Sequence, residues 1–207
     1  VLGLRGNQDL HTARAHVERV MGFEGTKEHV HQAKHNVSEA GNPANVSIAH
    51  WVAGAHAQLP LRTHTVDLVV SRNFFMHLDI DTLESHVKDL ARIIRPDGQC
   101  ILSILNPDYQ KKKYTQAHPF SSVLVEGQSY VFPHGPRGSL GGFVHYFKST
   151  ATYESIFSRY FHISEKVACH PRTDSLRETH PHYYDHDIPM AYVYVLSMQQ
   201  HNKKNMM

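Results

Sequence analysis

Short apolar runs alternate along the chain with segments in which apolar residues recur at helical spacing. Runs rich in β-branched residues are typical of the buried strands of a parallel sheet. We expect strands over residues 1–4, 19–23, 46–52, 66–71, 100–105, 161–168 and 190–198, and helices over 9–18, 26–40, 80–94 and 150–160. This alternation predicts an α/β fold with a mostly parallel sheet, in a single domain over residues 1–207.

The pattern changes in the stretch of about 106–145, which is rich in Pro, Gly, Lys, Ser and Tyr and has few periodic segments. So long an insertion in a compact domain is typical of a functional segment. We therefore expect a lid or substrate-binding insertion here. Tyr109, Tyr130 and Phe132 are candidates for an aromatic cap over an organic ligand.

The composition indicates which partners and which cellular compartment to expect. The chain has 21 Lys and Arg against 19 Asp and Glu, a net charge of +2 that is too small to indicate a nucleic-acid partner. No apolar run approaches the roughly 20 residues of a membrane span. Two cysteines make no disulfide framework, which favours a cytoplasmic protein. Because the chain begins with Val1, we expect that residues upstream have been lost.

An acid follows the second predicted strand at a position where α/β folds hold an adenosyl group. Glu24 comes about 20 residues after the glycine-bearing first turn, and a carboxylate there accepts both ribose hydroxyls. Gly25 lets such a group approach the backbone. The alternative is an acid that only stabilises the start of the next helix. The order of elements favours a Rossmann-like, doubly wound sheet.

Four segments resemble class I S-adenosylmethionine-dependent methyltransferases of the small-molecule type. Residues 52–61, VAGAHAQLPL, are similar to the family's V-x-G-D-A-x-x-L-P-F segment, and residues 66–78, VDLVVSRNFFMHL, to F-D-L-V-V-S-x-x-x-x-H-H-L. Residues 90–104, LARIIRPDGQCILSI, resemble L-x-R-V-L-K-P-G-G-x-L-x-I, and 20–36 resemble V-x-G-x-D-x-S-x-x-x-x-x-x-A-x-x-N. The resemblance covers about residues 1–105. It implies a sheet of about seven strands with the last antiparallel, S-adenosyl-L-methionine as cofactor, and a small-molecule methyl acceptor.

The resemblance also implies which residues contact the cofactor. They are Gly3, Leu4, Arg5, Gly6 and Asn7 of the first turn, Glu24 and Gly25, Ala55 and His56 after the third strand, and Ser71, Arg72 and Asn73 after the fourth.

Two histidines are candidates for catalytic residues. His77 follows the fourth strand, and as a general base it would deprotonate the acceptor; the alternative is a structural histidine. Residues 143–150, FVHYFKST, resemble an aromatic-histidine stretch that precedes the late helix of related methyltransferases. His145 and Tyr146 are therefore candidates for the lid or the substrate pocket.

Two positions depart from the family pattern. The first turn, VLGLRGNQD, keeps only fragments of D/E-x-G-x-G-x-G, and Ala55 stands where the family has an acid for the adenine amino group. Losing that charge-assisted hydrogen bond weakens binding about 10- to 100-fold. The sequence thus leaves a second interpretation, a catalytically silent protein of this fold that acts as a binding or regulatory partner.

Other chemistries find no support. Two histidine clusters match no metal-ligand signature, and we expect no functional metal: His31 with His35, and His180, His182, Asp185 and His186. The chain contains no G-x-S-x-G elbow, no C-x-x-C pair and no Walker-type lysine loop, which argues against a hydrolase or kinase. A nicotinamide-dependent oxidoreductase is a third class, which the methyltransferase-like segments disfavour.

Overall fold

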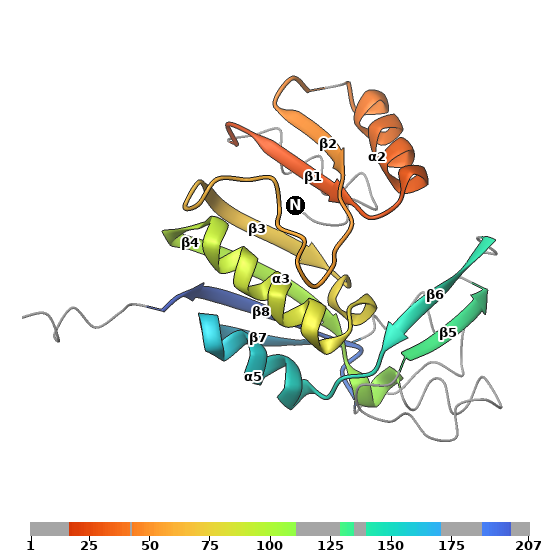
Figure 1. The fold of residues 1–207 in the computed structure, drawn as a ribbon, viewed down its shortest axis with the longest axis vertical. Helices are drawn as coiled ribbons and strands as arrows, with labels where there is room; N and C mark the ends of the chain where they lie inside the picture. Colours follow the sequence, from red (N-terminus) through yellow and green to blue (C-terminus); the bar gives the residue numbers. More distant parts are fainter. Residues whose placement is uncertain (1–16, 42, 111–128, 135–139, 171–187, 200–207) are drawn as a thin grey trace, which may run out of the picture.

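The computed structural model describes residues 17–41, 43–110, 129–134, 140–170 and 188–199 (Figure 1). The first predicted strand, the helix expected over 9–18 except for its last two residues, and residues 171–187 of the loop before the last strand lie outside the described residues.

Six strands form the sheet regions that the sequence predicted. β1 (Val20–Glu24) pairs in parallel with β2 (Val46–His50). The remaining strands are β3 (Val66–Arg72), β4 (Ile94–Leu105), β7 (Phe161–Cys169) and β8 (Ala191–Met198), in the order β3-β4-β8-β7. β3 and β4 are parallel, whereas β8 is antiparallel to both of its neighbours. The predicted α/β fold and its antiparallel last strand are confirmed.

Each of the three principal helices begins at a side chain that accepts a hydrogen bond from the first turn. α2 (Lys27–Glu39) starts after Thr26, α3 (Ile80–Ile93) after Asp79, and α5 (Thr150–Tyr160) after Ser149. Such caps satisfy backbone N–H groups that have no partner within the helix. The sequence had located all three helices to within two residues. Across the described part of the chain, no helix is both long and apolar enough to span a membrane.

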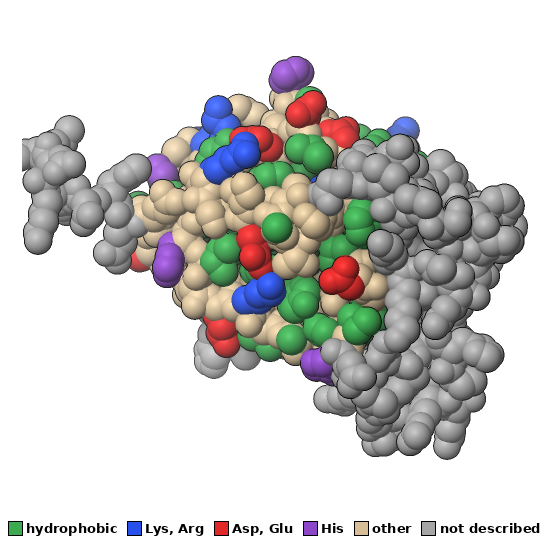
Figure 2. Space-filling view, turned by 90° about the horizontal axis from the view of Figure 1, so that it is seen from below, with side chains coloured by type: hydrophobic (Ala, Val, Ile, Leu, Met, Phe, Trp, Pro, Cys, Tyr) green, Lys and Arg blue, Asp and Glu red, His purple; other side chains and the backbone are tan. Residues whose placement is uncertain are grey.

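The core lies between the β3-β4-β8-β7 sheet and two helices that cover the same face of it (Figure 1). α3 contributes Leu83, Val87 and Leu90, which repeat at helical spacing and are fully buried. α5 contributes Phe157, whose ring packs edge to face on Tyr194 of β8. Seen from below, acidic, basic and hydrophobic side chains are interspersed on the described surface (Figure 2).

The junction between α3 and β4 differs from the prediction. Residues 95–98 were expected to form a turn before a strand starting at Cys100, but β4 begins at Ile94, immediately after the helix. Ile94 pairs with Val66, and the register then shifts before Gln99 pairs with Leu68. The turn-forming residues are therefore absorbed as an irregularity in the ladder. Gly98 permits this, since a Cβ there would lie 2.8 Å from the Asp67 carbonyl oxygen.

The insertion contains a β-hairpin that the sequence analysis missed. β5 (Ser129–His134) pairs antiparallel with β6 (Leu140–Tyr146), and Tyr130 lies opposite His145. In Figure 1 the hairpin projects beside the carboxyl end of β3. Its strands contain proline and adjacent glycines, which interrupt the alternation by which a strand is recognised in sequence.

Candidate functional site

The carboxyl end of β1 combines a buried carboxylate with open space. Glu24 is the last residue of β1 and is 7% exposed. Its carbonyl oxygen accepts a hydrogen bond of 3.0 Å from the backbone N–H of Trp51, which follows β2. A Cβ on Gly25 would meet no described atom within 4 Å. The structure thus places Glu24 at the strand end predicted for it, beside a backbone segment that a ligand can approach.

The loop of residues 51–62 leads away from the carboxyl end of β2. Its Ala57 N–H donates to the carbonyl oxygen of Gly54 at 3.0 Å, and this turn exposes Ala55 and His56. The indole Nε1 of Trp51 donates to the carbonyl oxygen of Gln58 at 3.0 Å, which closes the loop on itself. Both predicted adenine-side residues therefore stand on a loop that adjoins the end of β1.

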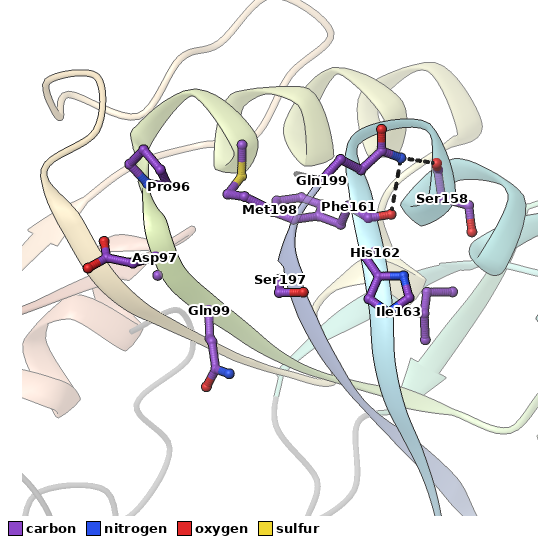
Figure 3. Close-up of a pocket in the computed structure, with 11 residues that line it drawn as sticks. Pro96, Asp97, Gln99, Ser158, Phe161, His162, Ile163, Ser197, Met198 and Gln199 are labelled. Atoms are coloured by element: carbon purple, nitrogen blue, oxygen red, sulfur yellow. Dashed lines mark hydrogen bonds between the residues drawn. The ribbon is translucent and has the colours of Figure 1, made fainter. Parts of the chain in front are cut away.

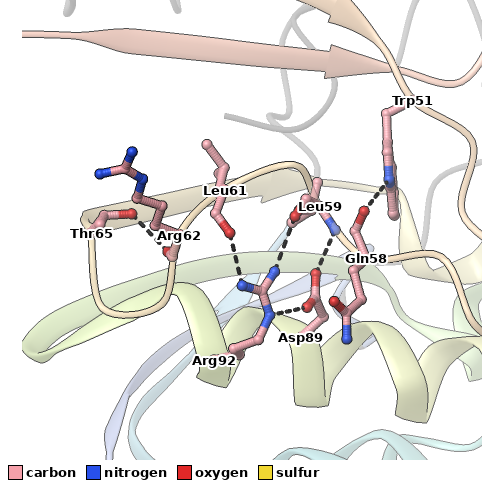
Figure 4. A network of polar contacts seen from close by, with 8 residues as sticks. All are labelled: Trp51, Gln58, Leu59, Leu61, Arg62, Thr65, Asp89 and Arg92. Carbon is pink, nitrogen blue, oxygen red and sulfur yellow. Dashed lines mark hydrogen bonds and ion pairs between the residues drawn. The ribbon is translucent and has the colours of Figure 1, made fainter.

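Helix α3 holds the second half of this loop through a polar network (Figure 4). The carboxylate of Asp89 accepts from the Leu59 N–H at 2.7 Å and from Arg92 Nε at 2.6 Å. The guanidinium of Arg92 also donates to the carbonyl oxygens of Leu61, at 2.8 Å, and Leu59, at 3.0 Å. Asp89 is 5% exposed, and its signal in the sequence is a charged residue on the apolar face of the predicted helix.

The carboxyl end of β3 carries the third group of predicted cofactor residues. Ser71 is buried, and its hydroxyl has no hydrogen-bond partner among the described residues. Arg72 is exposed. Asn73 has a positive φ of 51°, and its Oδ1 accepts from Ser103 Oγ at 3.1 Å. Asparagine tolerates this left-handed conformation better than most residues, and such strain is concentrated at functional turns.

The two catalytic candidates lie in direct contact. His77 ends the short helix η1 (Phe75–His77), and its ring packs edge to face on the ring of His145 from β6, with centroids 4.8 Å apart. His77 Nδ1 lies 3.0 Å from the carbonyl oxygen of Val144. Because a carbonyl only accepts, this bond assigns the proton of neutral His77 to Nδ1 and leaves Nε2 as its basic nitrogen.

A third histidine, which the sequence did not single out, lies on the buried face of α3. His86 of α3 is 1% exposed, and its ring contacts Trp51, Phe74 and Phe75 at centroid distances of 5.1–5.9 Å. Neither ring nitrogen has a hydrogen-bond partner among the described residues. Burial lowers the pKa of His86 to about 4, and the Asp89 carboxylate opposes that shift.

Lys148 is the buried cation at the base of the hairpin. It is 1% exposed, and its Nζ donates to the carbonyl oxygens of Leu78 and Tyr146. The ammonium also lies 5.4 Å from the centre of the Tyr153 ring. Lys148 thus joins the end of β6 to the residue that follows η1. In the sequence, Lys148 is part of the FVHYFKST segment, where nothing indicates that its ammonium is buried.

Several predicted residues are not brought into this region. Gly3, Leu4, Arg5, Gly6 and Asn7 lie outside the described residues, as do His180, His182, Asp185 and His186 and the side chains of Tyr130 and Phe132. His31 and His35 are exposed on α2, where His35 Nε2 lies 3.4 Å from a Glu39 carboxylate oxygen. Within the described ranges, no three histidine, cysteine or acidic side chains gather as a metal site.

A cavity of about 880 Å³ lies at the opposite edge of the sheet (Figure 3). Gly98 and Gln99 of β4, His162 of β7 and Ser197 of β8 are among the residues that line it. Gly98 and Gln99 mark the early part of β4, and Ser197 pairs with Gln99 and His162 there. Asn73 and Ser103, in contrast, mark the carboxyl end of β3 and the late part of β4. Because open α/β sheets bind ligands at the carboxyl ends of parallel strands, the cavity is separate from the candidate site.

Comparisons with known proteins agree with the α/β fold. Residues 2–102 match the family model described as a methyltransferase domain. The PH0226 protein from Pyrococcus horikoshii OT3 is 14% identical with a TM-score of 0.68, over 96% of this chain and 80% of that one. An S-adenosylmethionine-dependent methyltransferase from Mesorhizobium loti is 16% identical with a TM-score of 0.63, over 94% and 88%.

The N-methyltransferase NodS from Bradyrhizobium japonicum WM9, crystallised with S-adenosyl-L-homocysteine, is also similar in fold. It is 10% identical with a TM-score of 0.60, over 96% of this chain and 76% of NodS. No curated protein sequence matches the chain.

Proposed function

Because the chain belongs to the class I S-adenosylmethionine-dependent methyltransferases, we propose that it transfers a methyl group to a small organic acceptor. The observation that carries this proposal is the end of β1. Glu24 is a buried carboxylate there, and the next residue is a glycine with open space beside its Cα. A carboxylate at this edge suits the paired hydroxyls of a ribose.

The residues present at the site fit an adenosyl cofactor. In this proposal Glu24 accepts the ribose hydroxyls, the exposed turn with Ala55 and His56 borders the adenine, and Ser71, Arg72 and Asn73 edge the crevice toward the acceptor. The buried Ser71 hydroxyl, which lacks a described partner, is a polar group available to a ligand or a water. Bound S-adenosylmethionine supplies an electrophilic methyl group on a positively charged sulfur.

The histidine pair provides the base that the acceptor needs. A hydroxyl or amine acceptor must lose a proton as its oxygen or nitrogen forms the new bond to carbon. The Nδ1–H group of His77 donates a hydrogen bond to the Val144 carbonyl oxygen, so His77 receives the proton of the methyl acceptor at Nε2. The ring of His145 packs against His77 and fixes its orientation. The remaining work is alignment and exclusion of water, to which the hairpin contributes by carrying His145.

Calorimetric titration with S-adenosylmethionine and with S-adenosyl-L-homocysteine tests the proposal. We expect both compounds to bind at one site. If neither gives heat at millimolar concentration, the chain is a silent protein of this fold. If NADH binds in their place, the oxidoreductase class applies. Release of S-adenosyl-L-homocysteine in the presence of candidate hydroxyl and amine acceptors then identifies the acceptor class.

A further inference from the structure

We infer that Asp89 and Arg92 of α3 are positioning residues that set the affinity for the adenosyl cofactor by fixing the loop of residues 51–62. Neither side chain needs to touch the cofactor. The inference rests on the proposed function, and it assigns the cofactor affinity of that site in part to the polar network between α3 and the loop (Figure 4).

The loop has little internal structure of its own. Its first half is closed by the Trp51–Gln58 hydrogen bond and the Gly54–Ala57 turn. Most residues from 52 to 57 are small, and Ala55 and His56 are exposed. Small side chains leave the backbone many conformations, so its order must come from contacts elsewhere. In the described residues, α3 supplies three hydrogen bonds to this backbone, one from the Leu59 N–H and two to carbonyl oxygens.

The two charged side chains act as one unit. Asp89 is 5% exposed, and its two carboxylate oxygens are divided between the loop and Arg92. Arg92 in turn divides three nitrogens among Asp89, Leu59 and Leu61. Removing one partner of a buried ion pair leaves the other uncompensated. A lysine at position 92 retains the charge but lacks the planar fork that reaches two carbonyl oxygens at once.

The network is linked to the cofactor edge through the start of the loop. Trp51 donates its backbone N–H to the Glu24 carbonyl oxygen, and its indole donates to Gln58, the residue before Leu59. A loop released at Leu59 and Leu61 therefore loses its fixed position relative to Glu24. The predicted adenine-side residues, Ala55 and His56, lie between these two anchors.

Trp51 is the chain's single tryptophan, so its fluorescence reports on this loop directly. The experiment compares the full wild-type chain with Arg92→Lys and Asp89→Asn. Arg159→Lys is the matched control. Arg159 of α5 forms an ion pair of 2.6 Å with Glu84 of α3 but makes no described contact with the loop. Affinity for S-adenosyl-L-homocysteine is measured by calorimetry and by Trp51 emission, at a temperature where every variant is folded by circular dichroism.

We expect Arg92→Lys and Asp89→Asn to raise Kd by about tenfold or more, the effect of losing one charge-assisted hydrogen bond, and to shift Trp51 emission in the unliganded chain. Arg159→Lys should leave both unchanged. Equal Kd values and equal emission in all folded variants would overturn the inference. Absence of binding by the wild-type chain would instead contradict the proposed function, which keeps the two failures distinct.

Hydrogen exchange on the wild-type chain gives a test that needs no variant. If the clamp and the cofactor act on the same loop, S-adenosyl-L-homocysteine slows exchange of the Leu59 amide, which donates to Asp89. An equal exchange rate of the Leu59 amide with and without bound S-adenosyl-L-homocysteine would contradict the inference. This test remains valid even if both variants fail to fold.

Discussion

His77 and His145 meet edge to face with ring centroids 4.8 Å apart, although one ends a helix after β3 and the other lies in a hairpin of the insertion. The contact is reinforced by the backbone beside it, because Val144 accepts the Nδ1 proton of His77. The hairpin is further anchored by Lys148, which donates to the Leu78 carbonyl oxygen. Two residues singled out separately in the sequence thus form one cluster at the carboxyl edge of β3.

If His77 removes a proton from the acceptor, His77→Ala lowers kcat by roughly 10²-fold or more, the usual contribution of a general base. The Kd of S-adenosyl-L-homocysteine stays the same, because the proton acceptor does not hold the cofactor. Steady-state kinetics and calorimetry measure the two effects. His162→Ala is the control, since His162 is exposed at the opposite edge of the sheet. Wild-type kcat in His77→Ala would assign the residue a structural role.

Glu24→Gln separates cofactor binding from folding at the end of β1. We expect the Kd of S-adenosyl-L-homocysteine to rise about 10- to 100-fold, because a neutral amide replaces charge-assisted acceptors. Glu39→Gln removes the same charge from the exposed end of α2, and it should bind like the wild type. Titration calorimetry provides both constants. Matching Kd values for the two variants would remove Glu24 from the site.

The sequence predicted those parts of the fold in which the pattern of apolar residues matches the face that is buried. The β-branched run of β3 and the apolar spacing of α3 each specify one buried face, so their bounds were predicted to within two residues. The end of α3 was harder to predict, because Ile94 enters a strand where Pro96 and Gly98 indicate a turn. Long-range backbone pairing with Val66 overrides that local signal.

Residues of the candidate site could be predicted only where they belong to a recognisable sequence motif. Glu24 follows from its position after a strand, whereas the contact of His77 with His145 depends on a hairpin whose prolines and glycines hide the strand pattern. The roles of Asp89 and Arg92 were also hidden, because their partners are backbone atoms of Leu59 and Leu61. A sequence does not display which backbone carbonyl a side chain will reach.

Substitution by alanine should have different effects at two glycines, lowering stability at Gly98 and weakening cofactor binding at Gly25. Gly98→Ala places a Cβ 2.8 Å from the Asp67 carbonyl oxygen, an overlap that we expect to lower the free energy of unfolding by about 1–3 kcal/mol. Gly25→Ala meets no described atom within 4 Å and should leave the melting temperature unchanged while weakening cofactor binding. Thermal unfolding and calorimetry on both variants check this. A Gly25→Ala chain that binds like the wild type would show that no ligand approaches this backbone.

The buried ring of His86 predicts a specific loss of stability in acid. Its pKa of about 4 in the folded chain lies below the 6.5 of an unperturbed histidine, so between these pH values the unfolded chain binds the proton more readily. The stability contributed by neutral His86 is complete above pH 6.5 and falls as the pH drops toward 4, by about 3 kcal/mol in all.

Urea unfolding of the wild type and His86→Leu, at intervals between pH 7 and pH 4.5, isolates this effect. Acidic side chains also contribute to acid unfolding, but they are common to both proteins and cancel in the difference. We expect the wild type to lose stability relative to His86→Leu as the pH falls, because leucine has no proton to bind. His162→Leu, at an exposed position, should follow the wild type. Parallel curves for the wild type and His86→Leu would show that the ring protonates as readily in the folded chain as in the unfolded one, which its contacts with Trp51, Phe74 and Phe75 argue against.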